Sequence, residues 1–292
     1  KMSDAVEDVF HGELQQKNYL HLAGKLLALR NTLSFLIFAV LIIFAHDLLF
    51  ACSVSAVASL IITLILNLKF LPKWSVDFSK QTLKLLIWKC TPLFLGTFLS
   101  LYIYNAPKNA IDRFMSAEIQ AYYGILFMPA FVINLFSEFA FKPYLTSLAS
   151  LWLKKKIDVF MHQIKVLFLL IILLTTVVLV VGFLLGIPVL SWIYGVDLSP
   201  YLREFMILLL GGGFGAGAWL LNNILSAIRK QIALLEGYLV TSVISRIVAP
   251  ILVQRGGMMG AAFSYLFTIS LLFIILTCML VFIVNKTELS NK

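Results

Sequence analysis

VLFLLIILLTTVVLVVGFLL, residues 166–185, is an apolar run that contains no charged side chain and only two threonines and one glycine among its hydrophobic residues. A hydrocarbon core about 30 Å thick is crossed by about 20 helical residues, each of which rises about 1.5 Å. The run has that length, and its polar residues do not alternate with apolar ones as they do in a barrel strand. It therefore predicts a helix that crosses a membrane.

The composition of the whole chain extends this prediction. Of its 292 residues, 61% are hydrophobic and 13% are charged, whereas about 25% of the residues in a soluble domain are charged. Windows of about 20 residues give eight apolar segments. We therefore predict an all-α, polytopic membrane helix bundle with eight transmembrane helices. The predicted spans are Leu29–Ala45, Leu48–Leu68, Leu85–Tyr104, Ala121–Phe141, Val166–Leu185, Phe205–Leu225, Gly237–Val253 and Ala261–Val284.

The basic residues predict the orientation. If the N-terminus is cytoplasmic, the outer segments contain only Lys108, Arg113, Arg203 and Arg255, Arg246 lies within a span, and every other Lys and Arg lies on the inner side. This is the positive-inside pattern, so both ends of this chain are expected in the cytoplasm. The net charge of +9 is then explained by anionic lipid headgroups as partners, and no nucleic acid is expected.

Two polar segments suggest how the chain is organised. The first residues, KMSDAVEDVFHGELQQ, lack the apolar region of a signal peptide and are typical of a loop entered from a preceding helix, so we expect an N-terminal truncation. The segment 69–84, KFLPKWSVDFSKQTLK, is a Lys-rich connector with Pro72 as a breaker. The predicted parts are 1–71 with two spans, a cytoplasmic connector at 72–84, and 85–292 with six spans.

Chemistry-bearing side chains are scattered rather than clustered. The three cysteines and four histidines occur singly, without the spacing of a zinc site or of a disulfide framework. We therefore predict no metal and no cofactor. Because no catalytic constellation is visible either, we do not expect an enzyme.

Several motifs carry a resemblance to a known family. Residues 90–152 contain N-A-P-K-x-x-I-D, A-x-Y-G-I-L and F-K-P-x-L-T-x-L-A-x-x-W, and further along the chain come W-I-Y-G-V-D-L and G-x-x-G-A-A. Together they resemble oligosaccharide flippases of the polysaccharide-transporter branch of the multidrug/oligosaccharidyl-lipid/polysaccharide exporter superfamily. The first segment is similar to the seventh and eighth helices of these proteins, and the resemblance covers nearly the whole chain.

The resemblance implies both an architecture and an activity. Members have two six-helix lobes, so this chain would hold the last two helices of the first lobe and the complete second lobe. The implied function is to flip a lipid-linked oligosaccharide, or to export a polysaccharide precursor, across the bacterial cytoplasmic membrane by alternating access. Cell-envelope glycan assembly proteins are the implied protein partners.

Arg246 is the strongest candidate for a cargo ligand. A charged side chain near the centre of a span costs about 2.5–3.5 kcal/mol on insertion scales, so it usually faces a bundle interior or an aqueous cavity. Helical periodicity places Ser242, Ser245 and Arg246 on one side of the seventh predicted span. A guanidinium group suits the oxygens of a pyrophosphate. The alternative is a structural arginine paired with a carboxylate or with backbone carbonyls.

Four further residues are candidates, each with a simpler alternative. Glu138 is a predicted proton or cation coupling site, or else half of an i,i+4 ion pair with Lys142. Asn134 and Asn222 are predicted to line a cavity, although hydrogen bonding between helices explains them as well. Lys89 is predicted either to attract the cargo or to snorkel to the interface.

Two other functions, and one other motif, have sequence requirements of their own. A multidrug extruder of the same superfamily would need acidic cavity residues for cationic drugs, and a membrane acyl- or glycosyltransferase would need a carboxylate–His cluster at one membrane face. The glycine-rich run 211–217, GGGFGAG, is not followed by the G-K-[ST] of a phosphate-binding loop. Those glycines predict close approach of helices, or local unwinding.

Overall fold

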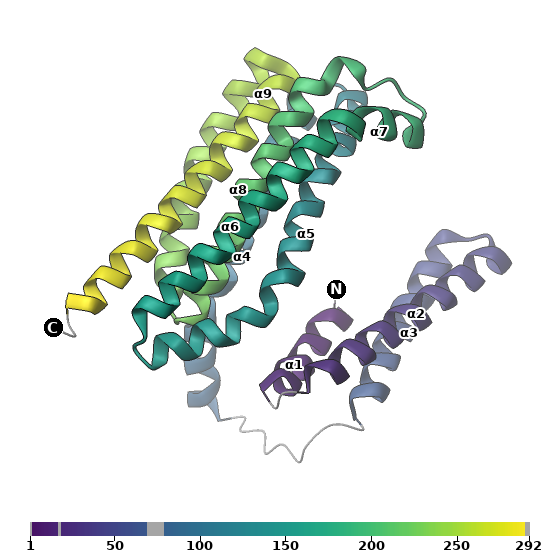
Figure 1. Cartoon of the computed structure of the whole chain (residues 1–292). Helices are drawn as coiled ribbons and strands as arrows, with labels where there is room; N and C mark the ends of the chain where they lie inside the picture. The colour runs from purple at the N-terminus through teal and green to yellow at the C-terminus, as the bar shows by residue number, and fades with distance from the viewer. Residues whose placement is uncertain (1, 17–18, 69–78, 290–292) are drawn as a thin grey trace. The chain divides into compact units, whose positions relative to one another are not determined.

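The computed structural model describes residues 2–16, 19–68 and 79–289, which are helical apart from short turns (Figure 1). The chain divides into two compact units, Lys1–Ser79 and Lys80–Lys292. Within the described residues, seven helices are long and apolar enough to cross a membrane.

The first unit contains helices α1 (Met2–Gln16), α2 (Leu20–Ala45) and α3 (Leu48–Leu68). Helices α2 and α3 form a hairpin whose turn contains His46 in the left-handed conformation, with φ of 50°. Asp47 then caps α3, because its Oδ1 accepts hydrogen bonds from the backbone N–H groups of Leu49 and Phe50 at 2.8 and 3.2 Å. The prediction of a loop over the first residues was wrong, since these residues form α1.

Arg30 explains why this polar segment folds as a helix. Its Nη2 donates a hydrogen bond to Asp4 Oδ1 at 2.8 Å, and its Nε lies 2.9 Å from Glu7 Oε2 as an ion pair without hydrogen-bond alignment. The side chains of Arg30 and Glu7 are only 6% and 3% exposed, and His11 Nε2 lies 3.5 Å from Glu7 Oε1. Arg30 is therefore a buried residue of α2 that ties α1 down, and not the inner-loop cation that the charge pattern predicted.

The two carboxylates of this cluster respond to Arg30 in opposite ways. Burial raises the pKa of Glu7, and the charge of Arg30 opposes that shift. The hydrogen bond from Arg30 lowers the pKa of the more exposed Asp4. The lowered pKa of Asp4 stabilises the fold at pH values above the pKa that this group has in the unfolded chain, and this stabilisation is lost as the pH falls. The raised pKa of Glu7 stabilises the fold at acid pH, and this stabilisation is lost as the pH rises.

The second unit contains the remaining helices. They are α4 (Lys80–Phe114), α5 (Ala117–Leu153), α6 (Ile157–Val181), the π-helical turn η1 (Gly182–Gly186), α7 (Ile187–Tyr194), the 3-10 turn η2 (Ser199–Tyr201), α8 (Leu202–Ala227) and α9 (Gln231–Leu289). Helix α9 is interrupted at Gly257, whose φ of 58° and ψ of −133° suit only glycine. It therefore supplies two crossings, which gives the eight that the sequence predicts.

Helix α4 is longer than the predicted third span at both ends. It begins at Lys80, so Lys80–Lys84 belong to the helix and not to the connector, and it continues through Pro107 to Phe114. Most of the connector, 69–78, lies outside the described residues. The expected turn at N-A-P-K is therefore helical, and Lys108 lies within α4.

Helix α8 is the centre of the second unit, with neighbours on three sides. It packs on α5, α6 and α9, and its glycines lie at those contacts. A Cβ added to Gly212 would lie 2.8 Å from the carbonyl oxygen of Ala130 in α5, and one added to Gly217 would lie 2.7 Å from the Phe273 ring in α9. This confirms the prediction that the run 211–217 allows close helix approach, while α8 itself is not unwound.

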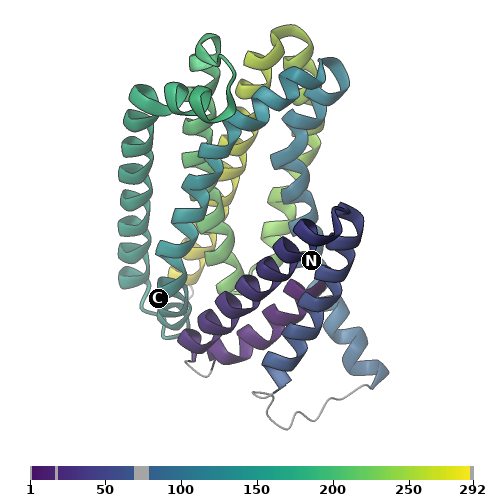
Figure 2. The same ribbon diagram turned by 90° about the vertical axis from the view of Figure 1, so that its right-hand side faces the viewer.

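The end of α6 turns away from the bundle. No charged residue occurs between Lys165 and Asp197, which is more chain than one perpendicular crossing of about 20 residues requires. The π-helical turn η1 and Pro188 redirect the chain into α7, which runs across one end of the unit (Figure 2). Trp192 of α7 is exposed, as expected for an aromatic side chain at a membrane interface.

We predict that Gly212→Leu destabilises the protein by about 1–3 kcal/mol, the usual effect of forcing extra atoms into a packed core. The obstacle is backbone, because the nearest atoms are the Ala130 carbonyl oxygen and Cα. Thermal unfolding in detergent measures the effect. Gly24→Ala is the control, since an added Cβ there meets nothing within 4 Å. Equal melting temperatures for the two variants would contradict this packing role.

We predict that Arg30→Leu loosens α1 at neutral pH, because removing one partner of a buried ion pair costs about 3–5 kcal/mol. Hydrogen exchange of the α1 backbone amides measures the loss. The defect should shrink at acid pH, where Glu7 is protonated and no longer needs a cation. The double variant Glu7→Leu with Arg30→Leu should restore most of the protection; a double variant as unprotected as the single one would refute the ion-pair explanation.

Candidate functional site

A helical hairpin in the second unit forms the frame of the candidate site. Helices α4 and α5 are joined by a short turn, where the Ser116 side chain caps α5 by accepting a hydrogen bond from the Ile119 N–H at 3.4 Å. Beyond this turn α4 packs mainly on α9 and α5 mainly on α8. The two helices therefore separate with distance from the turn, as Figure 2 shows.

A crevice of about 610 Å³ lies between the two helices next to the turn. This volume is within the range of small-molecule sites. Its described lining contains one charged residue, Lys108, and no carboxylate. The lining residues are Tyr104, Asn105 and Lys108 of α4, with Ala121, Tyr123, Gly124, Ile125, Phe127, Met128, Phe131 and Val132 of α5.

Aromatic rings line the inner wall of this crevice. The ring centroids of Tyr123 and Phe127 are 6.0 Å apart and nearly parallel. Phe127 meets Tyr265 of α9 edge to face at 4.9 Å, and Tyr104 lies 6.3 Å from Tyr265. Edge-to-face and offset contacts of this kind stabilise by about 0.5–1.5 kcal/mol beyond burial alone. The crevice thus has a rigid aromatic wall that connects three helices.

Several polar atoms behind the crevice lack a partner in the described part of the chain. They include the hydroxyl groups of Tyr123 and Tyr265 and the Oδ1 atom of Asn134. Leaving a buried polar group unpaired costs about 1–3 kcal/mol. Lys108 is exposed and has no carboxylate partner among the described residues. The crevice therefore offers a cation, and of the unpaired groups only the Tyr123 hydroxyl belongs to a residue of its described lining.

The residues predicted around Arg246 do not share one environment. Ser245 is fully buried with an unpartnered hydroxyl, and Ser242 is buried and donates to the Leu239 carbonyl oxygen at 2.9 Å. Arg246 instead lies on the exposed side of α9, next to exposed Ile247. In the described residues it has no ion-pair partner, and it is not part of the crevice lining.

The other predicted residues lie apart from one another. Asn222 accepts a hydrogen bond from the Tyr238 hydroxyl at 3.2 Å beside a small cavity of about 140 Å³. Asn134 lies against Gly215 of α8 and donates to the Ala130 carbonyl oxygen at 3.3 Å. Glu138 is paired with Lys142 at 2.9 Å, the geometry of the structural alternative. The side chain of Lys89 lies outside the described structure.

Sequence reasoning missed the crevice itself. The third span was predicted to end at Tyr104, so Lys108 was placed in the outer segment that follows it, and Tyr104 and Tyr123 were counted only as members of apolar runs. One available signal was their spacing: Tyr104, Asn105 and Lys108 lie three and four residues apart, which places them on one face if the helix continues through Pro107.

The described residues contain no group of three or more His, Cys, Asp or Glu side chains close enough to hold a metal ion. The site chemistry available here is hydrogen bonding, aromatic contact and the charge of Lys108. These groups suit binding.

Comparison with known proteins places the fold. No protein-family model matches the chain, and no curated protein matches its sequence. The structure is similar to one described as "Crystal structure of MATE in the bent conformation", with a TM-score of 0.72 and 11% sequence identity. The match covers 97% of this chain and 66% of that one. The chain therefore has the helical fold of a MATE transporter over about two thirds of that protein's length.

We predict that Tyr123→Phe does not destabilise the protein, because the lost hydroxyl has no partner among the described residues and removing it ends a desolvation cost of about 1–3 kcal/mol. Tyr238→Phe is the matched control, since it removes the hydrogen bond to Asn222 and should cost about 1 kcal/mol. Thermal unfolding in detergent compares them. A larger loss for Tyr123→Phe than for Tyr238→Phe would mean that its hydroxyl is bonded within the protein.

Proposed function

We propose that the chain belongs to a membrane transporter that moves a lipid-linked oligosaccharide, or exports a polysaccharide precursor, across the cytoplasmic membrane by alternating access. Two observations support this proposal: the MATE-like fold and the crevice between α4 and α5, whose described lining carries Lys108 without a carboxylate. The second observation favours an anionic cargo.

The charge of the crevice favours an anionic cargo. An ammonium group without a carboxylate partner attracts a phosphate or pyrophosphate and repels a cation. The nearest acidic side chains near the turn are engaged or outside the lining: Glu118 accepts a hydrogen bond from Tyr122 at 2.6 Å, and Asp112 is exposed on α4. A cationic drug would find no counter-ion in the described lining.

The aromatic wall and the polar side chains of the lining favour a glycan next to that anion. A saccharide presents hydroxyl groups that donate and accept hydrogen bonds, and the lining contains Tyr104, Asn105 and Tyr123. Pairing the unbonded Tyr123 hydroxyl with a sugar hydroxyl would recover the cost of leaving it buried and unpaired. The lipid tail of the cargo would remain in the hydrocarbon.

Arg246 is proposed as a second cation for the cargo. Its guanidinium is exposed and has no ion-pair partner among the described residues, and its planar fork suits pyrophosphate oxygens.

The partners at the membrane surface follow from the charge pattern. On the cytoplasmic side, Lys154, Lys155 and Lys156 would face anionic lipid headgroups of the inner leaflet, with both ends of this chain in the cytoplasm. Glycan assembly proteins of the cell envelope are the proposed partners.

A multidrug extruder is the second candidate. The similarity to a MATE structure favours it as much as it favours a flippase. The two functions differ in the charge of the cargo, so a charge reversal at Lys108 should affect them in opposite directions.

We predict that Lys108→Glu lowers transport of a labelled lipid-linked oligosaccharide by about tenfold or more, the equivalent of one charge-assisted hydrogen bond of at least about 1.4 kcal/mol. The assay uses the full-length protein in proteoliposomes. Lys108→Arg should retain most activity, and Arg203→Glu is the control for an exposed charge reversal on α8. Under the flippase proposal Arg246→Ala should also reduce transport without lowering the amount of protein, with Arg246→Lys between the two.

The opposite result would also distinguish the two functions. Transport of a cationic dye that increases in Lys108→Glu, with no movement of the oligosaccharide by the unmodified protein, would establish the extruder and reject the flippase.

A further inference from the structure

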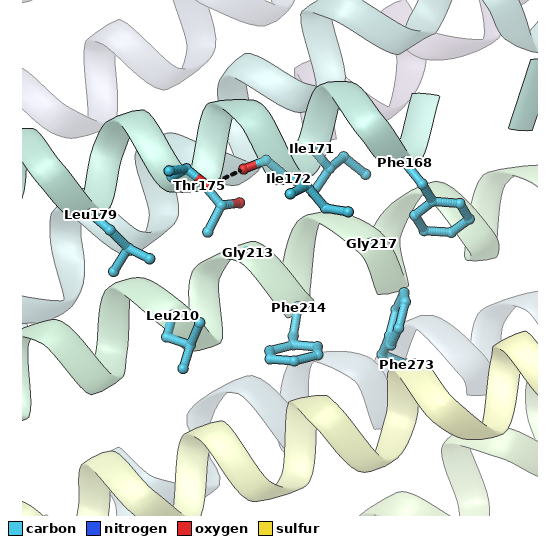
Figure 3. Close-up of a pocket in the computed structure, with 11 residues that line it drawn as sticks. Phe168, Ile171, Ile172, Thr175, Leu179, Leu210, Gly213, Phe214, Gly217 and Phe273 are labelled. Carbon is cyan, nitrogen blue, oxygen red and sulfur yellow. Dashed lines mark hydrogen bonds between the residues drawn. The ribbon is translucent and has the colours of Figure 1, made fainter. Parts of the chain in front are cut away.

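A second cavity opens on a different part of the second unit, away from the α4–α5 crevice. It has a volume of about 480 Å³ and lies between α6, α8 and the second segment of α9 (Figure 3). Its walls come mainly from Phe168, Ile172 and Leu179 of α6, Leu210 and Phe214 of α8, and Phe273 of α9. None of these side chains is charged.

Figure 3 shows that aromatic rings from all three helices gather at one end of this recess. Phe273 lies between two other rings and meets each edge to face: its centroid is 5.8 Å from that of Phe168 and 5.7 Å from that of Phe214. These contacts fix the rings in place. The recess is therefore a slot with a closed aromatic end, and not a shallow irregularity of the surface.

Glycines of α8 explain why protein does not fill the slot. A Cβ on Gly213 would lie 2.5 Å from Thr175 Cγ2, so the absence of a side chain lets α6 lie directly against α8. Gly217 does the same for Phe273. The helices meet at backbone distance there, and α8 projects no side chain from these two positions into the space beside the contact.

The surroundings decide what occupies the slot. It is continuous with the outer face of α6, where Leu169, Ile172 and Leu173 are 60% exposed or more, and this face belongs to the most hydrophobic of the crossings, with a mean hydropathy of 3.1. Water would find few partners, because Thr176 already donates to the Ile172 carbonyl oxygen at 2.8 Å and only the Thr175 hydroxyl is unpaired among the side-chain groups of the described lining. The medium on this face is lipid hydrocarbon.

We propose that this slot is a binding site for one hydrocarbon chain of a membrane lipid, inserted with its end toward Phe273. The attraction is dispersion, since lipid tails are as apolar as the lining and no hydrophobic gain is available in the bilayer. Walls that face a void lose their contact energy outright, and a chain lying along the slot restores it on three sides. The site does not depend on the transport proposal.

The test uses the full-length protein in phosphatidylcholine vesicles that contain a phosphatidylcholine with a photoreactive diazirine in one acyl chain. After illumination, mass spectrometry maps the labelled residues. Label should be enriched severalfold at Phe168, Phe214 and Phe273 over Leu169 and Leu173 on the outer face of α6. Leu210→Trp, which places a ring at a residue that lines the slot, should reduce labelling severalfold, whereas Leu169→Trp, outside the lining, should not.

Thr176→Phe serves as a second slot-filling variant if Leu210→Trp does not fold, with thermal unfolding as the check on folding. Labelling of the wild-type protein should also saturate and should fall when unlabelled phosphatidylcholine is added in excess. Uniform labelling of slot and outer face, or labelling that neither filling variant changes, would show that ordinary annular lipid covers α6 and would overturn the proposal. Neither outcome bears on whether the α4–α5 crevice binds a glycan.

Discussion

The second unit depends on the close approach of α5, α6 and α9 to α8. In a bilayer, apolar side chains gain nothing by leaving lipid for protein, so helices associate through van der Waals contact and need small residues to come close. The glycines of α8 meet this requirement in three directions: Gly212 toward Ala130, Gly213 toward Thr175 and Gly211 toward Tyr265. These contacts position α5, α6 and α9, and α4 in turn packs on α9.

Both cavities follow from that constraint. Because α5 is held against α8 and α4 against α9, the α4–α5 hairpin separates beyond its turn and leaves the crevice that Lys108 enters. Because α6 is held against α8 at Gly213, the space beside Phe273 is left without protein side chains. Close packing of helices on α8 thus leaves unfilled space beside these contacts and between α4 and α5. A larger residue at these glycines would alter the two cavities as well as the stability.

The sequence predicted the crossings well and the side-chain environments poorly, for physical reasons. Apolar length is a local property, so residues 166–185 could be assigned to a span without knowledge of any neighbour. Burial depends on which helices pack together. Arg246 and Ser245 are adjacent, yet one is exposed and the other fully buried. The burial of Arg30 could not be predicted, because its partners, Asp4 and Glu7, lie in a segment whose polar composition does not indicate a helix.

The unpaired groups around the crevice limit what it can hold. Buried hydroxyls without partners are tolerated at membrane depth where they border water or a ligand, since hydrocarbon cannot bond to them. Tyr123 has such a hydroxyl, and Lys108 lines the same crevice. A lipophilic cation there would leave this hydroxyl unbonded and would meet the ammonium charge. A phosphorylated glycan would replace the same water with its own hydroxyls and neutralise that charge, so the features that oppose a cationic drug lower the cost of admitting an anionic saccharide.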